Sequence, residues 1–193
     1  MKRDSKGEMM FDFIKIVKER RSVRKYEEKD IPEETLDQVL ESVLWAPSWA
    51  NTQCWEVVVV KDPDVKEKLQ ATLPEKGNPA RSAMVHAPVV LALCAKLKSS
   101  GYDKDQVTTK FGDWFMFDLG IVAQTLCLTA HSHGLGTVIV GLFDHDRGKA
   151  ILGVPQGYEL VTYIPIGYPA KKTEAPKRRE KEEFIHLNRF GGR

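Results

Sequence analysis

The sequence predicts an α+β fold, in which helices wrap a sheet of four or five strands. Apolar segments of strand length are mixed with segments of helical periodicity, without the strict alternation of a parallel α/β protein. The chain has 193 residues, enough for one domain with a sizeable core. Its hydrophobic share of 42% and charged share of 29% are ordinary for a soluble globular protein. We therefore treat residues 1–193 as a single domain.

Two segments near the N-terminus have the periodicity of amphipathic helices. Residues 9–20 carry apolar side chains every three or four positions. Residues 31–45 open with Pro32 and two glutamates, which suit the first turn of a helix, and then show one apolar face. Pro47 ends this second helix.

Three apolar segments are predicted as strands, at residues 56–61, 88–95 and 159–167. The first contains four consecutive valines, and such a continuous pattern indicates burial on both faces of the sheet. Shorter helices are expected at residues 62–73 and 144–153, and the leading aspartate of the latter can cap its first turn.

Residues 113–132 are predicted to form the longest helix, and it is apolar nearly all round. A helix of this kind needs cover on all sides, so we expect a second subunit to supply part of it. A membrane span is excluded by the polar residues it carries, which are Asp113, Asp118, Gln124 and His131. Gly134 is expected to end the helix.

Composition argues against several classes of function. The net charge of +2 is too small to indicate nucleic-acid binding, and the histidines lack the neighbours of a catalytic metal site. The cysteines Cys54, Cys94 and Cys127 form no C-x-x-C pair, and the last two are expected in the core. The first residues are charged and do not resemble a signal peptide, so a reducing cytoplasm is the simplest compartment.

Residues 20–24 concentrate three arginines and a serine where the first predicted helix ends. Guanidinium groups match phosphate oxygens two hydrogen bonds at a time. Arg20, Ser22 and Arg24 are spaced by two, so an extended backbone could direct all three side chains to one side. The alternative is a solvated cluster of surface charge.

Residues 46–55 form a polar loop that includes Trp49 and ends at Trp55. Asn51 within it offers both a donor and an acceptor to a flat heterocycle. The alternative is a simple connection between helix and strand. A phosphate-binding segment together with such a loop suggests a bound nucleotide or flavin.

The glycines of residues 134–141 could suggest a dinucleotide-binding fingerprint. That fingerprint follows a strand and opens a helix, whereas these glycines follow a helix and precede an extended segment. We therefore interpret Gly134 as a helix C-cap.

These motifs resemble those of the nitroreductase-like flavoproteins, which bind FMN and act as homodimers. The family signature R-R-S-x-R-x-[FY] matches residues 20–26, and A-P-S-x-x-N-x-Q-P-W matches residues 46–55, with Cys54 where proline is usual. The resemblance implies a mostly antiparallel sheet in an intertwined homodimer, with the long helix at the interface. Residues 171–193 would form a C-terminal arm that extends to the partner subunit.

The resemblance also implies which residues contact FMN. Arg20 and Ser22 would hold the phosphate and ribityl chain, Arg21 would also contact FMN, and Arg24 would lie near the pyrimidine edge of the ring. The loop of the other subunit, the flavin face and the basic tail would add Pro47, Ser48, Trp49, Asn51, Val140, Gly141, Lys177 and Arg179. For the last two residues, a solvated basic tail is the alternative.

The function implied by the resemblance is FMN-dependent oxidation of NADH or NADPH, coupled to reduction of a nitroaromatic, quinone or similar small molecule. No catalytic side chain is assigned; Arg24 would act electrostatically. Substrate choice is expected to lie with Trp49 and residues 96–117. Alternatives are another flavin reaction, such as dehalogenation or flavin degradation, and a non-catalytic FMN-binding storage or sensor protein. The expected partners are a second copy and a small molecule, without nucleic acid or membrane.

Overall fold

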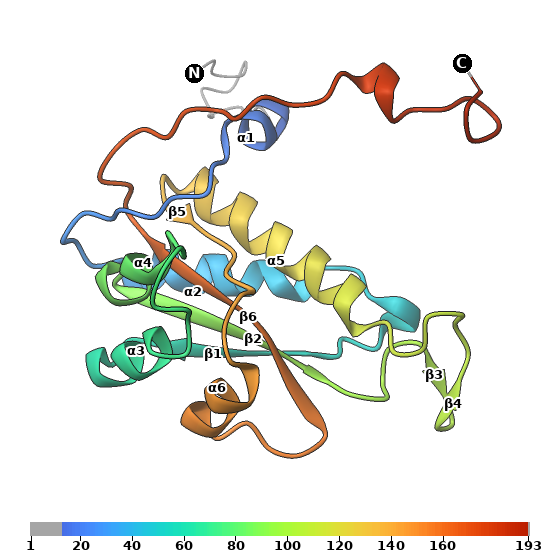
Figure 1. Cartoon of the computed structure of the whole chain (residues 1–193), viewed down its shortest axis with the longest axis horizontal. Coiled ribbons are helices and arrows are strands. Elements are labelled where there is room, and N and C mark those ends of the chain that lie inside the picture. Colours follow the sequence, from blue (N-terminus) through green and yellow to red (C-terminus); the bar gives the residue numbers. More distant parts are fainter. Residues whose placement is uncertain (1–12, 193) are drawn as a thin grey trace.

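The computed structural model describes residues 13–192 and has an α+β architecture around one antiparallel sheet (Figure 1). The sheet has four strands in the order β1-β2-β6-β5. Their bounds are Trp55–Val60 for β1, Val89–Lys96 for β2, Tyr158–Gly167 for β6 and Gly136–Thr137 for β5. The predicted fold class is confirmed, and each of the three predicted strands is present.

Helices pack on both faces of this sheet (Figure 1). On one face lie α2 (Glu33–Glu41), which continues as a 3-10 turn over Ser42–Trp45, and the long α5 (Phe115–Ser132). The opposite face is covered by α3 (Pro63–Gln70), α4 (Arg81–His86) and α6 (His145–Leu152). The short α1 (Phe13–Glu19) contacts α5.

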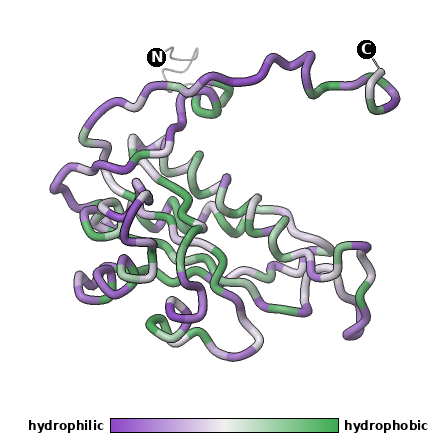
Figure 2. Tube along the Cα trace, in the orientation of Figure 1, coloured by the Kyte–Doolittle hydropathy of each residue, from purple (hydrophilic) through white to green (hydrophobic). Residues whose placement is uncertain are grey.

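The central strand β2 supplies both halves of the core because its side chains alternate between the two faces. Leu91 and Leu93 pack with α2 and α5, whereas Val90 and Ala92 pack with α3, α4 and α6. All four are fully buried. Figure 2 shows the same pattern, with hydrophobic residues gathered along the strands and α5.

The prediction that the valine-rich strand is buried on both faces is wrong. Within β1 only Val60 is buried, and Val59 remains 37% exposed. The reason is position in the sheet: β1 is an edge strand that pairs only with β2 among the described strands. The helical layers centre on β2 and β6 and leave the edge partly open.

The helix boundaries agree closely with those predicted from the sequence. The first helix ends at Glu19, and the predicted start at residue 9 lies outside the described residues. In α6 the carboxylate of Asp144 accepts from the backbone N–H of Arg147 at 3.0 Å, and Gly153 closes the helix with a φ of 65°. Neither α4 nor the small hairpin of β3 (Tyr102–Asp103) and β4 (Gln106–Val107) was predicted.

One side of α5 is left uncovered within the described chain. Met116 and Phe117 are 61% and 60% exposed, and they border a shallow groove along the helix. Leu119, Val122 and Leu126 on the other side are buried. The expectation that a second subunit covers the exposed side remains a prediction.

The C-terminal segment runs away from the sheet as an extended arm (Figure 1). Its only helical turn among the described residues is the 3-10 segment Lys181–Glu183. The apolar side chains of Phe184, Ile185, Leu187 and Phe190 are exposed in this arm. Contact of the arm with a partner remains a prediction. Between residues 13 and 192, no helix combines the length and apolarity that a bilayer crossing requires.

Candidate cofactor-binding site

The arginine-rich segment follows α1 in an extended conformation that is fastened to the end of the sheet. The backbone N–H of Val23 donates to the carbonyl of Thr137 at 2.8 Å, and Ser22 forms a parallel bridge with the same residue. Below them, the buried hydroxyl of Tyr26 donates to the carbonyls of Val23 and Pro165, at 2.8 and 3.0 Å. These contacts hold the backbone from which the arginines project.

Arg20, Arg21, Ser22 and Arg24 together line a cavity of about 340 Å³. The opposite wall comes from the start of the C-terminal arm, with Thr173, Glu174, Pro176 and Arg178. The structure therefore brings all four predicted residues of this segment to one place. Four guanidinium groups and the hydroxyls of Ser22 and Thr173 form a donor set suited to a phosphate group, with Glu174 as the one carboxylate among the described lining residues.

The side chain of Arg21 has a donor that the protein leaves unused. Its Nη1 donates to the carbonyls of Lys18 and Arg20, at 2.6 and 2.8 Å. Its Nε is buried and finds no acceptor among the described residues. A buried donor without an acceptor costs free energy, so an anionic oxygen in the cavity would satisfy this group.

A second cavity of about 450 Å³ borders the same arginines on the side of α5. His131, from the last turn of α5, lines it together with Glu19, Arg20 and Arg21. Burial lowers the pKa of His131 below 6.5; Glu19 opposes this effect, and the two arginines add to it. The sequence analysis did not place His131 at the binding site and missed its position beside the arginines.

The basic tail contributes a different residue from the two expected. Arg178 lines the arginine cavity, and Lys177 and Arg179 are not among its lining residues. Arg179 instead donates from Nη2 to the carbonyl of Glu183 at 2.7 Å, and its Nε lies 3.2 Å from that carboxylate. Adjacent side chains of an extended arm point to opposite sides, which separates Arg178 from its neighbours. The roles of Lys177 and Arg179 remain predictions.

The polar loop between α2 and β1 is held in a tight conformation by its own side chains. The hydroxyl of Ser48 accepts from the backbone N–H of Gln53 at 3.0 Å. The Gln53 amide donates to Oδ1 of Asn51 at 3.2 Å, so Gln53 acts in support of the loop. Ala50, Asn51 and Gln53 all have positive φ, at 44°, 55° and 46°.

The loop and the arginine segment lie toward opposite ends of α5 (Figure 1). The backbone N–H of Trp49 donates to Asp118 in the first turn of α5, and His131 near the other end lines the second cavity beside Arg20 and Arg21. Thirteen helical positions correspond to about 20 Å along the axis. Within one chain, the loop residues Pro47 to Asn51 are thus not brought to the arginine cavity.

Val140 and Gly141 lie on the segment that continues from β5. Val140 pairs with Tyr163 of β6 through two backbone hydrogen bonds, of 2.9 and 3.0 Å. Gly141 is exposed, and a side chain at this position would meet no atom within 4 Å. Thr137, at the start of this segment, pairs with Ser22, which lines the arginine cavity. The segment therefore begins beside that cavity.

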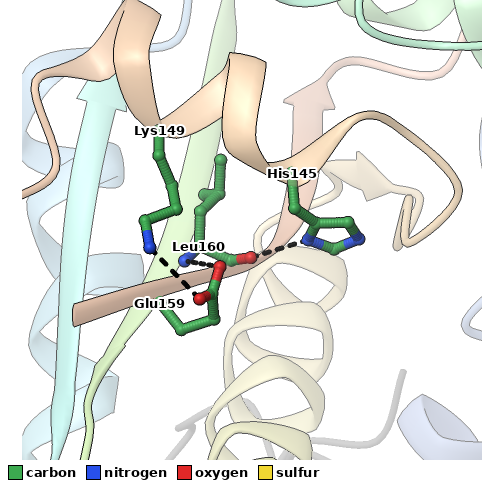
Figure 3. Close-up of polar contacts among 4 residues, drawn as sticks. All are labelled: His145, Lys149, Glu159 and Leu160. Atoms are coloured by element: carbon green, nitrogen blue, oxygen red, sulfur yellow. Dashed lines mark hydrogen bonds and ion pairs between the residues drawn. The ribbon is translucent and has the colours of Figure 1, made fainter. Parts of the chain in front are cut away.

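The far end of that segment is secured by α6 (Figure 3). The Nδ1 atom of His145 lies 2.8 Å from the carbonyl of Leu160, so the imidazole donates from Nδ1. One turn further on, Lys149 forms a half-buried ion pair with Glu159 at 3.2 Å. The segment between β5 and α6 is thereby fixed to β6 at both ends.

The thiol of Cys54 does not face the expected site. It is buried and donates to the carboxylate of Asp118 at 3.7 Å. Burial and the nearby carboxylate raise its pKa to about 12, which makes it a poor nucleophile. Cys94 and Cys127 are also free and buried, as predicted for core residues. No cluster of His, Cys, Asp or Glu within residues 13–192 has the makings of a metal site.

Known proteins resemble this chain over most of its length. The model of the nitroreductase family matches residues 17–168. An NADH dehydrogenase of Thermus thermophilus is 31% identical over 86% of this chain and 91% of its own length. A protein of Methanothermobacter thermautotrophicus is also 31% identical, over 93% of this chain and 88% of its own.

More distant matches extend to other activities and to solved structures. Human iodotyrosine deiodinase 1 is 25% identical over 88% of this chain and 65% of its own. An FMN-dependent nitroreductase of Clostridium difficile superposes with a TM-score of 0.76 and 26% identity, covering 92% of this chain and 99% of that one. The fold, the matched segment and the identity of these relatives show that the chain belongs to the nitroreductase family.

Proposed function

We propose that this chain is an FMN-dependent oxidoreductase that oxidises NADH or NADPH and reduces a nitroaromatic, quinone or similar small molecule. The observation that carries the proposal is the cavity lined by Arg20, Arg21, Ser22, Arg24 and Arg178. The unused Nε donor of Arg21 indicates that an anion completes it. The flavin, when bound, supplies the hydride chemistry, and the protein supplies orientation and charge.

Each part of the chain has a distinct role in this proposal. The Arg20 and Arg21 guanidiniums and the Ser22 hydroxyl bind the phosphate and ribityl chain. Arg24, which is exposed at the mouth of the cavity, stabilises negative charge on the ring edge. The backbone of Val140 and Gly141 forms one wall, where the absence of a side chain permits close approach.

A second copy of the chain is part of the proposal. The loop from Pro47 to Asn51 lies about 20 Å along α5 from the arginine cavity of its own chain, too far for both to contact one ring. The exposed apolar side of α5 gives a second copy a surface to cover. In the proposed dimer each loop completes the cavity of the other subunit, and Pro47, Ser48, Trp49 and Asn51 contact the flavin there.

The relatives support the choice of reaction and name one alternative. The Thermus thermophilus protein is named an NADH dehydrogenase and the Clostridium difficile structure an FMN-dependent nitroreductase. The deiodinase relatives favour reductive dehalogenation as the second candidate, although they are more distant. Three buried free thiols suit a reducing compartment, and we propose the cytoplasm.

Purification followed by absorbance, mass in solution and turnover tests these statements together. We expect a yellow dimer that oxidises NADH or NADPH with menadione or a nitrofuran. Turnover with an iodotyrosine and not with menadione would favour the dehalogenase. Yellow protein without turnover would favour storage or sensing, and protein that cannot be reconstituted with FMN would overturn the proposal.

A further inference from the structure

Asp118 is a carboxylate buried within the first turn of α5, with only 1% of the residue exposed. Three donors from other segments satisfy it. The backbone N–H of Trp49 donates to Oδ1 at 3.1 Å, and the hydroxyl of Ser100 donates to Oδ2 at 2.6 Å. The thiol of Cys54 also donates to Oδ2, at 3.7 Å. A buried charge is tolerated only when it is hydrogen-bonded in this way.

These donors belong to two segments that are far apart in sequence. Trp49 and Cys54 lie on the polar loop, which the proposed function places against the flavin. Ser100 lies on the segment that precedes α5, within residues 96–117, where substrate choice is expected. Within the described part of the chain, Asp118 is the one side chain that forms hydrogen bonds to both segments.

The polar loop needs an external anchor because its own backbone is strained. Ala50, Asn51 and Gln53 all occupy the left-handed region, which is unfavourable for residues with a side chain. Such conformations persist where surrounding contacts determine them, and they cluster at functional sites. The bond from Trp49 to Asp118 fixes the entrance of this strained stretch. At its exit the Cys54 thiol donates to Asp118, and the Cys54 carbonyl accepts from the backbone N–H of Lys96 at 2.7 Å.

The second segment is likewise organised around its serine. The carbonyl of Ser100 accepts from the backbone N–H of Trp114 at 2.9 Å, directly before α5. Gly101, with a φ of 85°, then leads into the β3–β4 hairpin. A side chain on Gly101 would approach the carbonyl of Gly112 to 2.5 Å, so the two ends of the segment are in close contact. A shift of Ser100 would therefore be transmitted to the whole hairpin.

We propose that Asp118 is a positioning residue that sets the flavin-facing loop and the substrate-facing segment relative to one another. The inference rests on the proposed function, because it assigns the two segments their ligands on that basis. Asp118 itself is buried beneath both segments, so its assigned role is positioning and not direct contact with a ligand.

Cys54 is the part of this arrangement that departs from the family signature, where proline is usual. A proline offers no donor from its side chain, whereas the thiol adds a third hydrogen bond to Asp118. With its pKa raised to about 12, the thiol keeps its proton under ordinary conditions and can always donate. Cys54 also serves as a built-in probe, because it becomes reactive only if the loop opens.

The test compares three substitutions with a control in the opposite half of the core. Asp118→Asn keeps the shape and removes the charge, whereas Ser100→Ala and Cys54→Ala each remove one donor. Leu69→Ala is the control, because Leu69 is fully buried on the other face of the sheet. The readouts are FMN affinity, KM and kcat with menadione, and labelling of Cys54 by a thiol reagent, located by mass spectrometry.

We expect Asp118→Asn to weaken FMN binding and to raise KM, each by about tenfold, as loss of a charged hydrogen bond implies. The kcat at saturating FMN and substrate should stay within about twofold, and Cys54 should become labelled. Ser100→Ala should raise KM alone, and Cys54→Ala should weaken FMN binding alone. Leu69→Ala should lower the stability of the protein without a selective change in FMN affinity or in KM.

Several outcomes would overturn the inference. Normal binding of FMN and substrate by Asp118→Asn, with Cys54 still protected, would show that the carboxylate does not position the loop. Labelling of Cys54 without a change in affinity or KM would show that loop position is irrelevant, while the proposed function would stand. If Asp118→Asn does not fold, the other two variants still test the inference. It would be contradicted if Ser100→Ala and Cys54→Ala changed KM and FMN affinity equally, or if each changed the quantity expected of the other. Failure of the unmodified protein to bind FMN would overturn both the inference and the proposed function.

Discussion

The backbone of Val23 is hydrogen-bonded to Thr137 in β5, with an N–O distance of 2.8 Å, at a point where Gly136 leaves no room for a side chain. A Cβ on Gly136 would lie 2.5 Å from Cγ2 and 2.7 Å from Cβ of Val23. The arginine segment is thus held by a backbone hydrogen bond and by packing of the Val23 side chain against Gly136. Any disturbance of that contact moves Arg20, Ser22 and Arg24 together.

The first prediction concerns this contact. Gly136→Ala should destabilise the protein by about 1–3 kcal/mol, the usual cost of overpacking, and weaken FMN binding. Thermal unfolding and FMN titration measure the two effects. The double variant with Val23→Ala should recover part of both losses, because the clashing methyl groups are gone. If the two substitutions prove additive, the contact does not carry the arginine segment.

Arg20→Ala should weaken FMN binding by about 10- to 100-fold, because it removes a charge-assisted hydrogen bond to phosphate. Lys61→Ala is the matched control, since Lys61 forms a surface ion pair with Glu33 and lies away from the cavity. Fluorescence titration with FMN compares the variants. Equal losses for both substitutions would contradict the phosphate assignment.

His131 should report on occupation of the arginine cavities. Its pKa lies below 6.5 because of burial, with a further contribution from Arg20 and Arg21. Binding of FMN or inorganic phosphate neutralises those guanidiniums, so the pKa of His131 should rise. NMR titration of the imidazole with and without ligand measures the change. Arg20→Ala should raise the pKa in the ligand-free protein, and a fall in either experiment would contradict the proposed anion site.

Stability should decrease at alkaline pH because buried thiols and a buried phenol resist ionisation. Burial raises the pKa of Cys54 from 9.0 to about 12, of Cys94 from 9.0 to about 11, and of Tyr163 from 10.0 to about 12. The unfolded chain therefore releases protons first, and stability present below pH 9 is lost as pH rises toward 12.

The expected slope is roughly 1.4 kcal/mol per pH unit for each group that has ionised only in the unfolded chain. Urea unfolding between pH 8 and 11 measures this slope, and only pH values at which refolding is reversible are used. Cys94→Ala should reduce the slope near pH 10 by roughly 1.4 kcal/mol per pH unit, which is the contribution of one ionising group. An unchanged slope in that variant would show that the thiol does not contribute.

Much of the fold could be predicted because local patterns and buried positions coincide. The apolar pattern located α5, and residue type located α6, whose first turn Asp144 was expected to cap. The valine-rich strand was misjudged because four consecutive apolar residues indicate a strand and say nothing of its place in the sheet. The short α4 was missed because six residues give too little periodicity.

For the site, residue types were enough to predict the chemistry of the groups: guanidiniums and a hydroxyl at residues 20–24, and a polar loop at residues 46–55. The tertiary fold sets which of these groups meet. It brought Arg178 and His131 to the arginines, and it placed the loop about 20 Å away along α5, on a buried carboxylate. Residue type sets which bonds a side chain can form, whereas the packing of distant segments sets which partners lie within reach.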